Sequence, residues 1–225
     1  IAVLRYDDRG VGQSTGSHAT ATLLDFAEDV RAALAWLRQR PEVDPRRIAL
    51  VGHSEGGLVA PMVAADDPLL GGVVLMAGPS RSGRDILAYQ NRMVIERDTA
   101  IAPEQRDSAV AAALVQLDSL ARASRGFAFF LDHDPLPTAR RLRLPVLILQ
   151  GATDRQVTAD QADELAAAIR SSGNRKVVKH SFAETNHLFL ADREGYPGGY
   201  ARLRETRVRR NVLGLLTDWL VATLR

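Results

Sequence analysis

Apolar and polar positions along the chain follow two rhythms, one typical of buried strands and one typical of amphipathic helices. Short apolar runs predict five strands, at residues 1–4, 48–51, 72–77, 146–150 and 177–182. Steps of three and four residues between apolar positions predict core helices at 22–40, from Ser54 to about Ala65, at 159–170 and at 207–224. Strands that alternate with helices imply a mostly parallel sheet covered on both faces. The predicted fold class is therefore α/β.

The interval between the third and fourth predicted strands breaks this rhythm. Residues 78–145 are far more than one crossover helix needs, and 84–97 and 103–123 are helical in pattern. We therefore expect a core made of residues 1–77 and 146–225, with a helical cap insertion at 78–145 above the carboxyl edge of the sheet. The alternative is a longer run of ordinary surface helices.

Composition narrows the classes of partner. The chain has 225 residues, of which 46% are hydrophobic and 25% charged, as expected for one globular domain or a domain with an insertion. A net charge of +2 gives no basic face of the kind that binds nucleic acid. Five arginines do cluster near the C-terminus, and we expect them to form a solvated helix face: Arg202, Arg204, Arg207, Arg209 and Arg210.

Cysteine and histidine usage argues against metal and thiol chemistry. The chain has no cysteine, which excludes disulfides, a thiol nucleophile and cysteine metal ligands. No histidine pair has metal-ligand spacing, and Asp132-His133-Asp134 lacks the rhythm of a calcium loop. We expect no metal and no cofactor. No apolar run reaches the roughly 20 residues of a transmembrane helix, and the sequence leaves localisation open.

The most specific motif is Gly52-His53-Ser54-Glu55-Gly56, directly after the strand predicted at 48–51. A Gly-x-Ser-x-Gly turn between a strand and a helix is typical of a nucleophile elbow, which exposes the serine hydroxyl on a strained corner. We expect a Cβ atom at either Gly52 or Gly56 to clash, because strand and helix approach closely there. The alternative for Ser54 is a glycine-flanked surface turn.

A serine nucleophile needs a base, and the base needs a carboxylate that holds its tautomer. Asp154 lies four residues beyond the strand at 146–150, and His187 follows the strand at 177–182. The chain order Ser, Asp, His is the order of α/β-hydrolase triads. The alternative for Asp154 is a helix cap, while Asp160 and Asp163 lie within the predicted helix.

Four other histidines compete with His187 for the role of base. His53 neighbours the nucleophile, so we expect it to point away and to pack or hydrogen-bond behind it. His18 lies in a polar loop, His133 in the insertion and His180 inside a strand. We expect these to be structural or solvent-facing.

An oxyanion hole needs two donors aimed at the developing negative charge. We expect the main-chain N–H of Glu55, at the start of the helix, to be one of them. The second donor normally comes from a loop before the strand that opens this chain.

Taken together, these segments resemble the α/β-hydrolase superfamily, and within it bacterial esterases of the EstD type and serine-aminopeptidase-like hydrolases. The resemblance rests on residues 6–16 (Tyr-Asp-Asp-Arg-Gly-Val-Gly-Gln-Ser-Thr-Gly), on residues 52–57, on Leu144-Pro145 through Asp154, and on Asn186-His187-Leu188-Phe189. It implies that Ser54, Asp154 and His187 hydrolyse carboxylic esters and that a helical cap shapes the pocket.

The resemblance also implies that something precedes residue 1. The family usually has three strands and the oxyanion loop before the segment that opens this chain. We therefore expect the chain to be N-terminally incomplete, with a gap in the sheet beside the strand at 48–51.

The predicted function is hydrolysis of a small-molecule ester through an acyl-enzyme intermediate. One alternative is an aminopeptidase or other amide hydrolase with the same three residues. Another is a non-catalytic binding module, since fold does not fix function. The sequence does not predict the oligomeric state.

Overall fold

A single parallel sheet organises the protein, whose computed structural model describes residues 1–225. Its four strands stand in the order β1 (Ala49–His53), β2 (Gly72–Met76), β3 (Val146–Gly151) and β4 (Val177–Phe182). All neighbouring strands run parallel, so their carboxyl ends meet at one edge of the sheet. The α/β class with a parallel sheet is confirmed.

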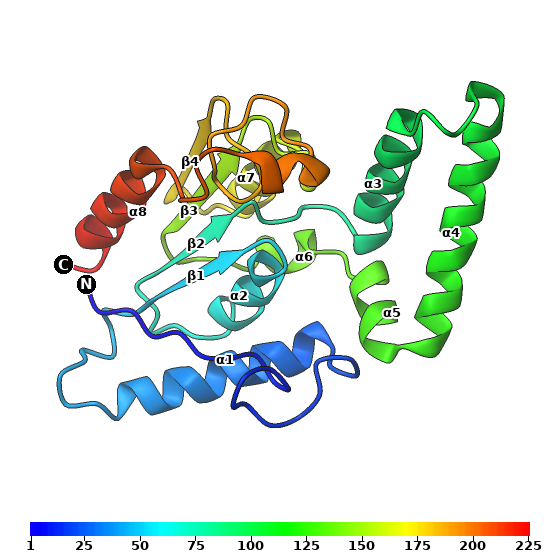
Figure 1. Ribbon diagram of the computed structural model, residues 1–225. Coiled ribbons are helices and arrows are strands. Elements are labelled where there is room, and N and C mark those ends of the chain that lie inside the picture. Colours follow the sequence, from blue (N-terminus) through cyan, green and yellow to red (C-terminus); the bar gives the residue numbers. More distant parts are fainter.

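Alternating side chains of the strands build a core on each face of the sheet. Val73, Leu75 and Ile148 pack in one cluster with residues of α1 (Leu23–Arg38), α2 (Gly56–Ala64) and α7 (Asp160–Ser171). Val74 and Leu149 point to the opposite face, which α8 (Arg210–Thr223) covers. Figure 1 shows α1 and α2 below β1 and β2, with α8 (red) on the other side. Helices therefore cover both faces, as the alternation of strands and helices predicts.

Local signals in the sequence define where the first helix begins. Thr22 accepts a hydrogen bond from the Asp25 N–H while the Asp25 side chain accepts from the Thr22 N–H, forming a reciprocal capping box. Asp29, one turn further along α1, holds Arg9 of the N-terminal loop in a bidentate ion pair, with both contacts at 2.7 Å. The loop at residues 9–22 is thereby tied to α1.

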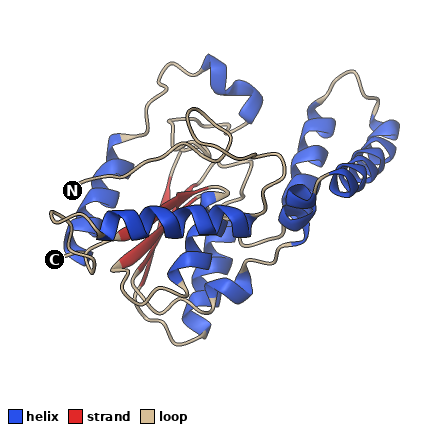
Figure 2. Ribbon diagram, turned by 90° about the horizontal axis from the view of Figure 1, so that it is seen from below, coloured by secondary structure: helices blue, strands red, loops and turns tan.

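The segment between β2 and β3 is helical throughout. It comprises α3 (Gly83–Arg97), the 3₁₀ turn η1 (Pro103–Gln105), α4 (Arg106–Ala123), α5 (Arg125–Asp132) and α6 (Leu136–Ala139). Helices α3, α4 and α5 form a group that stands to one side of the sheet (Figures 1 and 2). The predicted helices at 84–97 and 103–123 correspond to α3 and to η1 with α4, whereas the short α5 and α6 were not predicted. The role of this segment as a cap stays a prediction.

The strand predicted at residues 1–4 is wrong. Residues 1–8 form no strand, and Ile1 and Val3 are 69% and 78% exposed. The N-terminal segment lies outside the sheet (Figure 1), so its backbone has no ladder to complete. In consequence β1 is an edge strand, and the side chain of Val51 at its centre is 49% exposed.

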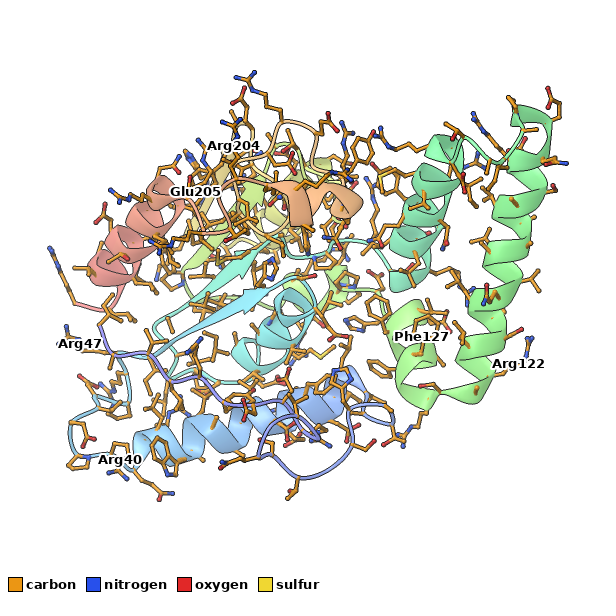
Figure 3. The ribbon with its side chains drawn as sticks, in the orientation of Figure 1. Arg40, Arg47, Arg122, Phe127, Arg204 and Glu205 are labelled. Carbon is orange, nitrogen blue, oxygen red and sulfur yellow. The ribbon has the colours of Figure 1, made fainter.

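The arginine cluster near the C-terminus is not one helix face, because α8 begins only at Arg210. Arg202 ends the 3₁₀ helix η2 (Pro197–Arg202), and residues 203–209 form a loop. Figure 3 labels Arg204 and Glu205 on this loop, where both are exposed. Arg209 is half-buried and donates to the carbonyl of Ala183 at 2.6 Å, so it fastens the loop after β4.

No helix of the protein combines the length and the apolar character that crossing a membrane requires.

Candidate active site

Ser54 occupies a strained turn between β1 and α2. Its φ angle is 54°, in the left-handed region that non-glycine residues rarely adopt. The Ser54 N–H donates to the carbonyl of Met76 at 2.9 Å, which joins the turn to the end of β2. The strand, sharp turn and helix expected of an elbow are therefore present.

Of the two glycines in this turn that we expect to be sterically restricted, only one is. A Cβ atom on Gly52 would lie 2.0 Å from the carbonyl oxygen of Gly56, so the clash predicted there is confirmed. At Gly56 the prediction is wrong, because a Cβ would meet nothing within 4 Å. The second restricted position is Gly57, where a Cβ would lie 2.6 Å from the Cα of Gly78. Close packing of α2 against the loop after β2 explains this requirement.

Asp154 and His187 meet at the carboxyl edge of the sheet. Asp154 follows β3, His187 follows β4, and His187 Nδ1 lies 2.8 Å from Asp154 Oδ2. They are 3% and 4% exposed. Gly151 lets the two loops approach, because a Cβ there would lie 2.3 Å from the carbonyl oxygen of Thr185.

Both oxygens of the Asp154 carboxylate have hydrogen-bond partners. Oδ1 accepts from the main-chain N–H groups of Gln156 and Val157 at 2.8 and 3.0 Å. Oδ2 accepts from Gln150 Nε2 at 3.1 Å and faces His187 Nδ1. Four polar N–H groups therefore surround this one buried carboxylate and fix its orientation.

Asn186 shapes the turn that carries His187. Its side-chain oxygen accepts from the N–H groups of Leu188 and Leu190, both at 3.0 Å, and its side chain is fully buried. Asn186 is not among the site residues expected from the sequence. An asparagine that holds its own turn is a recognisable local signal.

His53 ties the nucleophile strand to the loop of the base. Its Nε2 lies 2.8 Å from the carbonyl oxygen of His187, and the two rings are 4.8 Å apart. Desolvation is the main cause that lowers the pKa of His53; the hydrogen bond with the His187 carbonyl and the charge of Asp154 act against it, while the His187 ring lowers the pKa further. The neutral ring then donates its Nε2–H to the main-chain carbonyl of His187, so His53 hydrogen-bonds as expected. It does not pack away from the site, because its ring lies beside that of His187.

The hydroxyl of Ser54 forms no hydrogen bond with the ring of His187 in this structure. The structure thus joins Asp154 to His187 directly, and joins His187 to the serine turn through His53.

Comparison with known proteins decides the family. The model of the alpha/beta hydrolase family matches residues 1–201. The chain belongs to this family.

Relatives of this α/β hydrolase include Esterase EstD of Thermotoga maritima, 26% identical over 233 residues that cover 98% of this chain and 53% of that protein. The chain thus spans about half the length of this curated relative. Among solved structures, Pyrococcus furiosus esterase Pf2001 aligns with a TM-score of 0.52 and 18% identity over 76% of this chain and 56% of that chain. Paleococcus ferrophilus monoacylglycerol lipase aligns with a TM-score of 0.53 and 17% identity over 94% and 80%. These two likenesses concern the fold alone.

In this α/β hydrolase, the main-chain N–H of Glu55 has no acceptor within the chain. It lies at the start of α2, where N–H groups and the helix dipole favour an anion. The Glu55 carboxyl is exposed overall, yet crowding by neighbouring atoms desolvates it and raises its pKa. Its role as an oxyanion donor stays a prediction.

The remaining histidines lie elsewhere. His180 is on β4 and its ring packs 4.4 Å from that of Phe182, while His18 packs 5.1 Å from Phe26. His133 stacks on Phe129 at the end of α5, and desolvation lowers its pKa. None of the three hydrogen-bonds to Ser54 or Asp154.

Two contacts connect the helical segment of this α/β hydrolase to the loops of the site. The Gln90 side chain on α3 donates to the carbonyl of Gln156 at 3.1 Å, within the Asp154 loop. At the end of α3, the guanidinium of Arg97 lies 3.6 Å from the ring centroid of Tyr196, just before η2. Helix α3 therefore contacts the acid side of the site.

Proposed function

We propose that this chain is a serine hydrolase that cleaves carboxylic esters, with Ser54 as nucleophile, His187 as base and Asp154 as the orienting acid. The observation that carries the proposal is the buried 2.8 Å hydrogen bond between Asp154 and His187, at the sheet edge where the strained Ser54 turn also lies. The curated relative named an esterase supports the ester class of substrate.

The proposed reaction has two steps. His187 accepts the Ser54 hydroxyl proton as Oγ attacks the ester carbonyl, and the Asp154 carboxylate stabilises the imidazolium. The tetrahedral oxyanion accepts a hydrogen bond from the main-chain N–H of Glu55. Collapse breaks the ester C–O bond, and His187 gives its proton to the leaving alcohol. His187 then takes a proton from water as the water oxygen attacks the acyl carbonyl. Collapse breaks the bond between the acyl carbon and Ser54 Oγ, His187 returns its proton to Oγ, and the acid is released.

The missing hydrogen bond between Ser54 and His187 is compatible with this sequence of events. In enzymes of this type the bond between nucleophile and base is often long or misaligned until substrate binds. The strained backbone of Ser54 holds the serine at the sharp turn between β1 and α2.

Ser54→Ala in the intact protein tests the nucleophile. We expect hydrolysis of p-nitrophenyl acetate to fall by roughly 10⁴–10⁶ in kcat, because no oxygen remains to form the acyl-enzyme. Labelling by a fluorophosphonate probe, which needs an activated serine, is expected to disappear.

Ser80→Ala is the matched control, since Ser80 is buried but bonds to Glu164, away from the proposed triad. It is expected to keep both signals. Wild-type activity that survives in Ser54→Ala contradicts the assignment of the nucleophile. A folded wild-type protein without hydrolysis or labelling favours a non-catalytic binding module.

A further inference from the structure

A buried glutamine contacts the acid of the proposed triad. Gln150 is on β3 and is fully buried, after four consecutive apolar residues, Val146 to Leu149. Its Nε2 lies 3.1 Å from Asp154 Oδ2 and 2.9 Å from the carbonyl oxygen of Val157. One side-chain amide therefore bridges both ends of the loop that holds the carboxylate.

The orientation of this amide follows from its neighbours. The groups around Nε2 are all acceptors: Asp154 Oδ2, the carbonyl of Val157 and, at 3.5 Å, the carbonyl of Gly151. An amide turned by 180° would place an oxygen against three oxygens. The NH₂ group must therefore face Asp154.

This arrangement has an energetic cost. Gln150 Oε1 is buried and has no hydrogen-bond partner. An unpaired buried polar atom is unfavourable, and the rest of β3 is entirely apolar on both faces. A hydrophobic residue would satisfy the requirements of the core at this position, so packing alone does not account for glutamine.

We propose that Gln150 is a positioning residue for the reaction proposed above, on which this inference rests. Its Nε2–H occupies one lone pair of Asp154 Oδ2, while two main-chain N–H groups occupy Oδ1. The lone pair left on Oδ2 points at His187 Nδ1. Gln150 thereby fixes the plane of the carboxylate and, through it, the tautomer and direction of the imidazole.

Gln150→Met in the intact protein tests this role, because methionine keeps the length and the apolar contacts but removes the donor. We expect kcat for p-nitrophenyl acetate to fall roughly tenfold or more, about 1.4 kcal/mol per factor of ten, with KM within twofold. The ¹H–¹⁵N signal of the His187 Nδ1–H, assigned with His187→Gln, is expected to shift and to exchange faster with water.

Gln161→Met is the matched control. Gln161 is 2% exposed, and its side chain bonds to the Ser80 N–H and to Thr158, not to the proposed triad. Both variants lose buried hydrogen bonds, so each is expected to lower Tm by about 2–4 °C. Only Gln150→Met is expected to change kcat and the His187 signal.

Equal losses of kcat in the two variants, or a Gln150→Met enzyme within twofold of wild type, overturn the inference. Absence of hydrolysis and of fluorophosphonate labelling in the wild type instead overturns the proposed function. In that case the His187 signal still tests the role of Gln150. A shifted signal in Gln150→Met supports the positioning role, and an unchanged signal shows that the amide does not position Asp154 and His187.

Discussion

The proposed site has an acid–base side, formed by Asp154 and His187, and a nucleophile side, formed by the turn at Ser54. The two sides are held in different ways. Asp154 and His187 follow β3 and β4, and β3 is buried along its whole length between two neighbouring strands. Ser54 follows β1, an edge strand whose middle residue, Val51, is 49% exposed. The acid–base side is fixed by side-chain hydrogen bonds, four of them around one carboxylate.

The nucleophile side depends on the backbone instead. Ser54 is fixed by a positive φ angle, by one main-chain hydrogen bond to β2 and by close contact at Gly52 and Gly57. Preorganisation by polar side chains needs a dry environment, which the central strand β3 provides for Asp154, whereas β4, which leads to His187, is the other edge strand. We therefore expect changes at Asp154 and at the groups that hold it to reduce mainly activity, whereas changes at the glycines of the elbow reduce mainly stability.

After removal of the nucleophile itself, the largest expected effect is that of Asp154→Asn. An amide NH₂ would face donors on His187 or Gln150, so the imidazole loses its orienting acceptor. We expect kcat for ester hydrolysis to fall by about 10⁴, as for similar acids in serine hydrolases. Circular dichroism should confirm a folded protein. Asp163→Asn is the control, because Asp163 is paired with Lys179 at the surface, and it is expected to stay within twofold of wild type.

A glycine pair tests the elbow. Gly52→Ala places a Cβ 2.0 Å from a main-chain oxygen, which must move, and we expect a loss of about 1–3 kcal/mol in the free energy of unfolding. Gly56→Ala meets open space at the start of α2, and alanine favours a helix, so we expect no loss and a gain of up to about 1 kcal/mol. Urea denaturation measures both. Equal destabilisation by the two changes is the result that would contradict this account of the turn.

The smallest expected effect is the pH dependence of stability that comes from His53, the residue that connects the strand of the nucleophile to the loop of His187. The pKa of His53 is lowered, chiefly by desolvation, from an ordinary value of 6.5. His53 therefore binds a proton more readily in the unfolded chain than in the folded protein. The free energy of unfolding decreases as the pH drops below about 6.5. The main-chain carbonyl of His187 and the Asp154 carboxylate favour a charge on this ring, whereas the His187 ring opposes it.

Replacing His53 by glutamine, which keeps a donor for the His187 carbonyl, should flatten the fall of Tm between pH 7 and pH 5. His133 also has a lowered pKa and is unchanged in this variant, so part of the slope remains. Identical slopes of Tm against pH in wild type and His53→Gln would show that His53 titrates in the same way in the folded and the unfolded protein, which would contradict this account.

Sequence patterns were sufficient for the class of fold and for the placement of the chemistry. Apolar runs located all four observed strands, and the hydrolase-like motifs located the turns after β1, β3 and β4. Such features are local: a buried strand, a cap such as Thr22 or a Gly-x-Ser-x-Gly turn is encoded by neighbouring residues. The parallel arrangement then brings the carboxyl ends together without further information.

Only the tertiary structure decided which of these local preferences are realised. Residues 1–4 have a strand-like pattern but no neighbouring strand, and a strand without a partner does not form. Gly56 matched the motif, yet Gly57 is the position that the packing of α2 restricts. The partners of Gln150 and His53 depend on how separate strands and loops meet, and in the case of His53 the partner is 134 residues away. Local patterns define elements and their order, whereas contacts between distant elements define how the proposed acid and base are held.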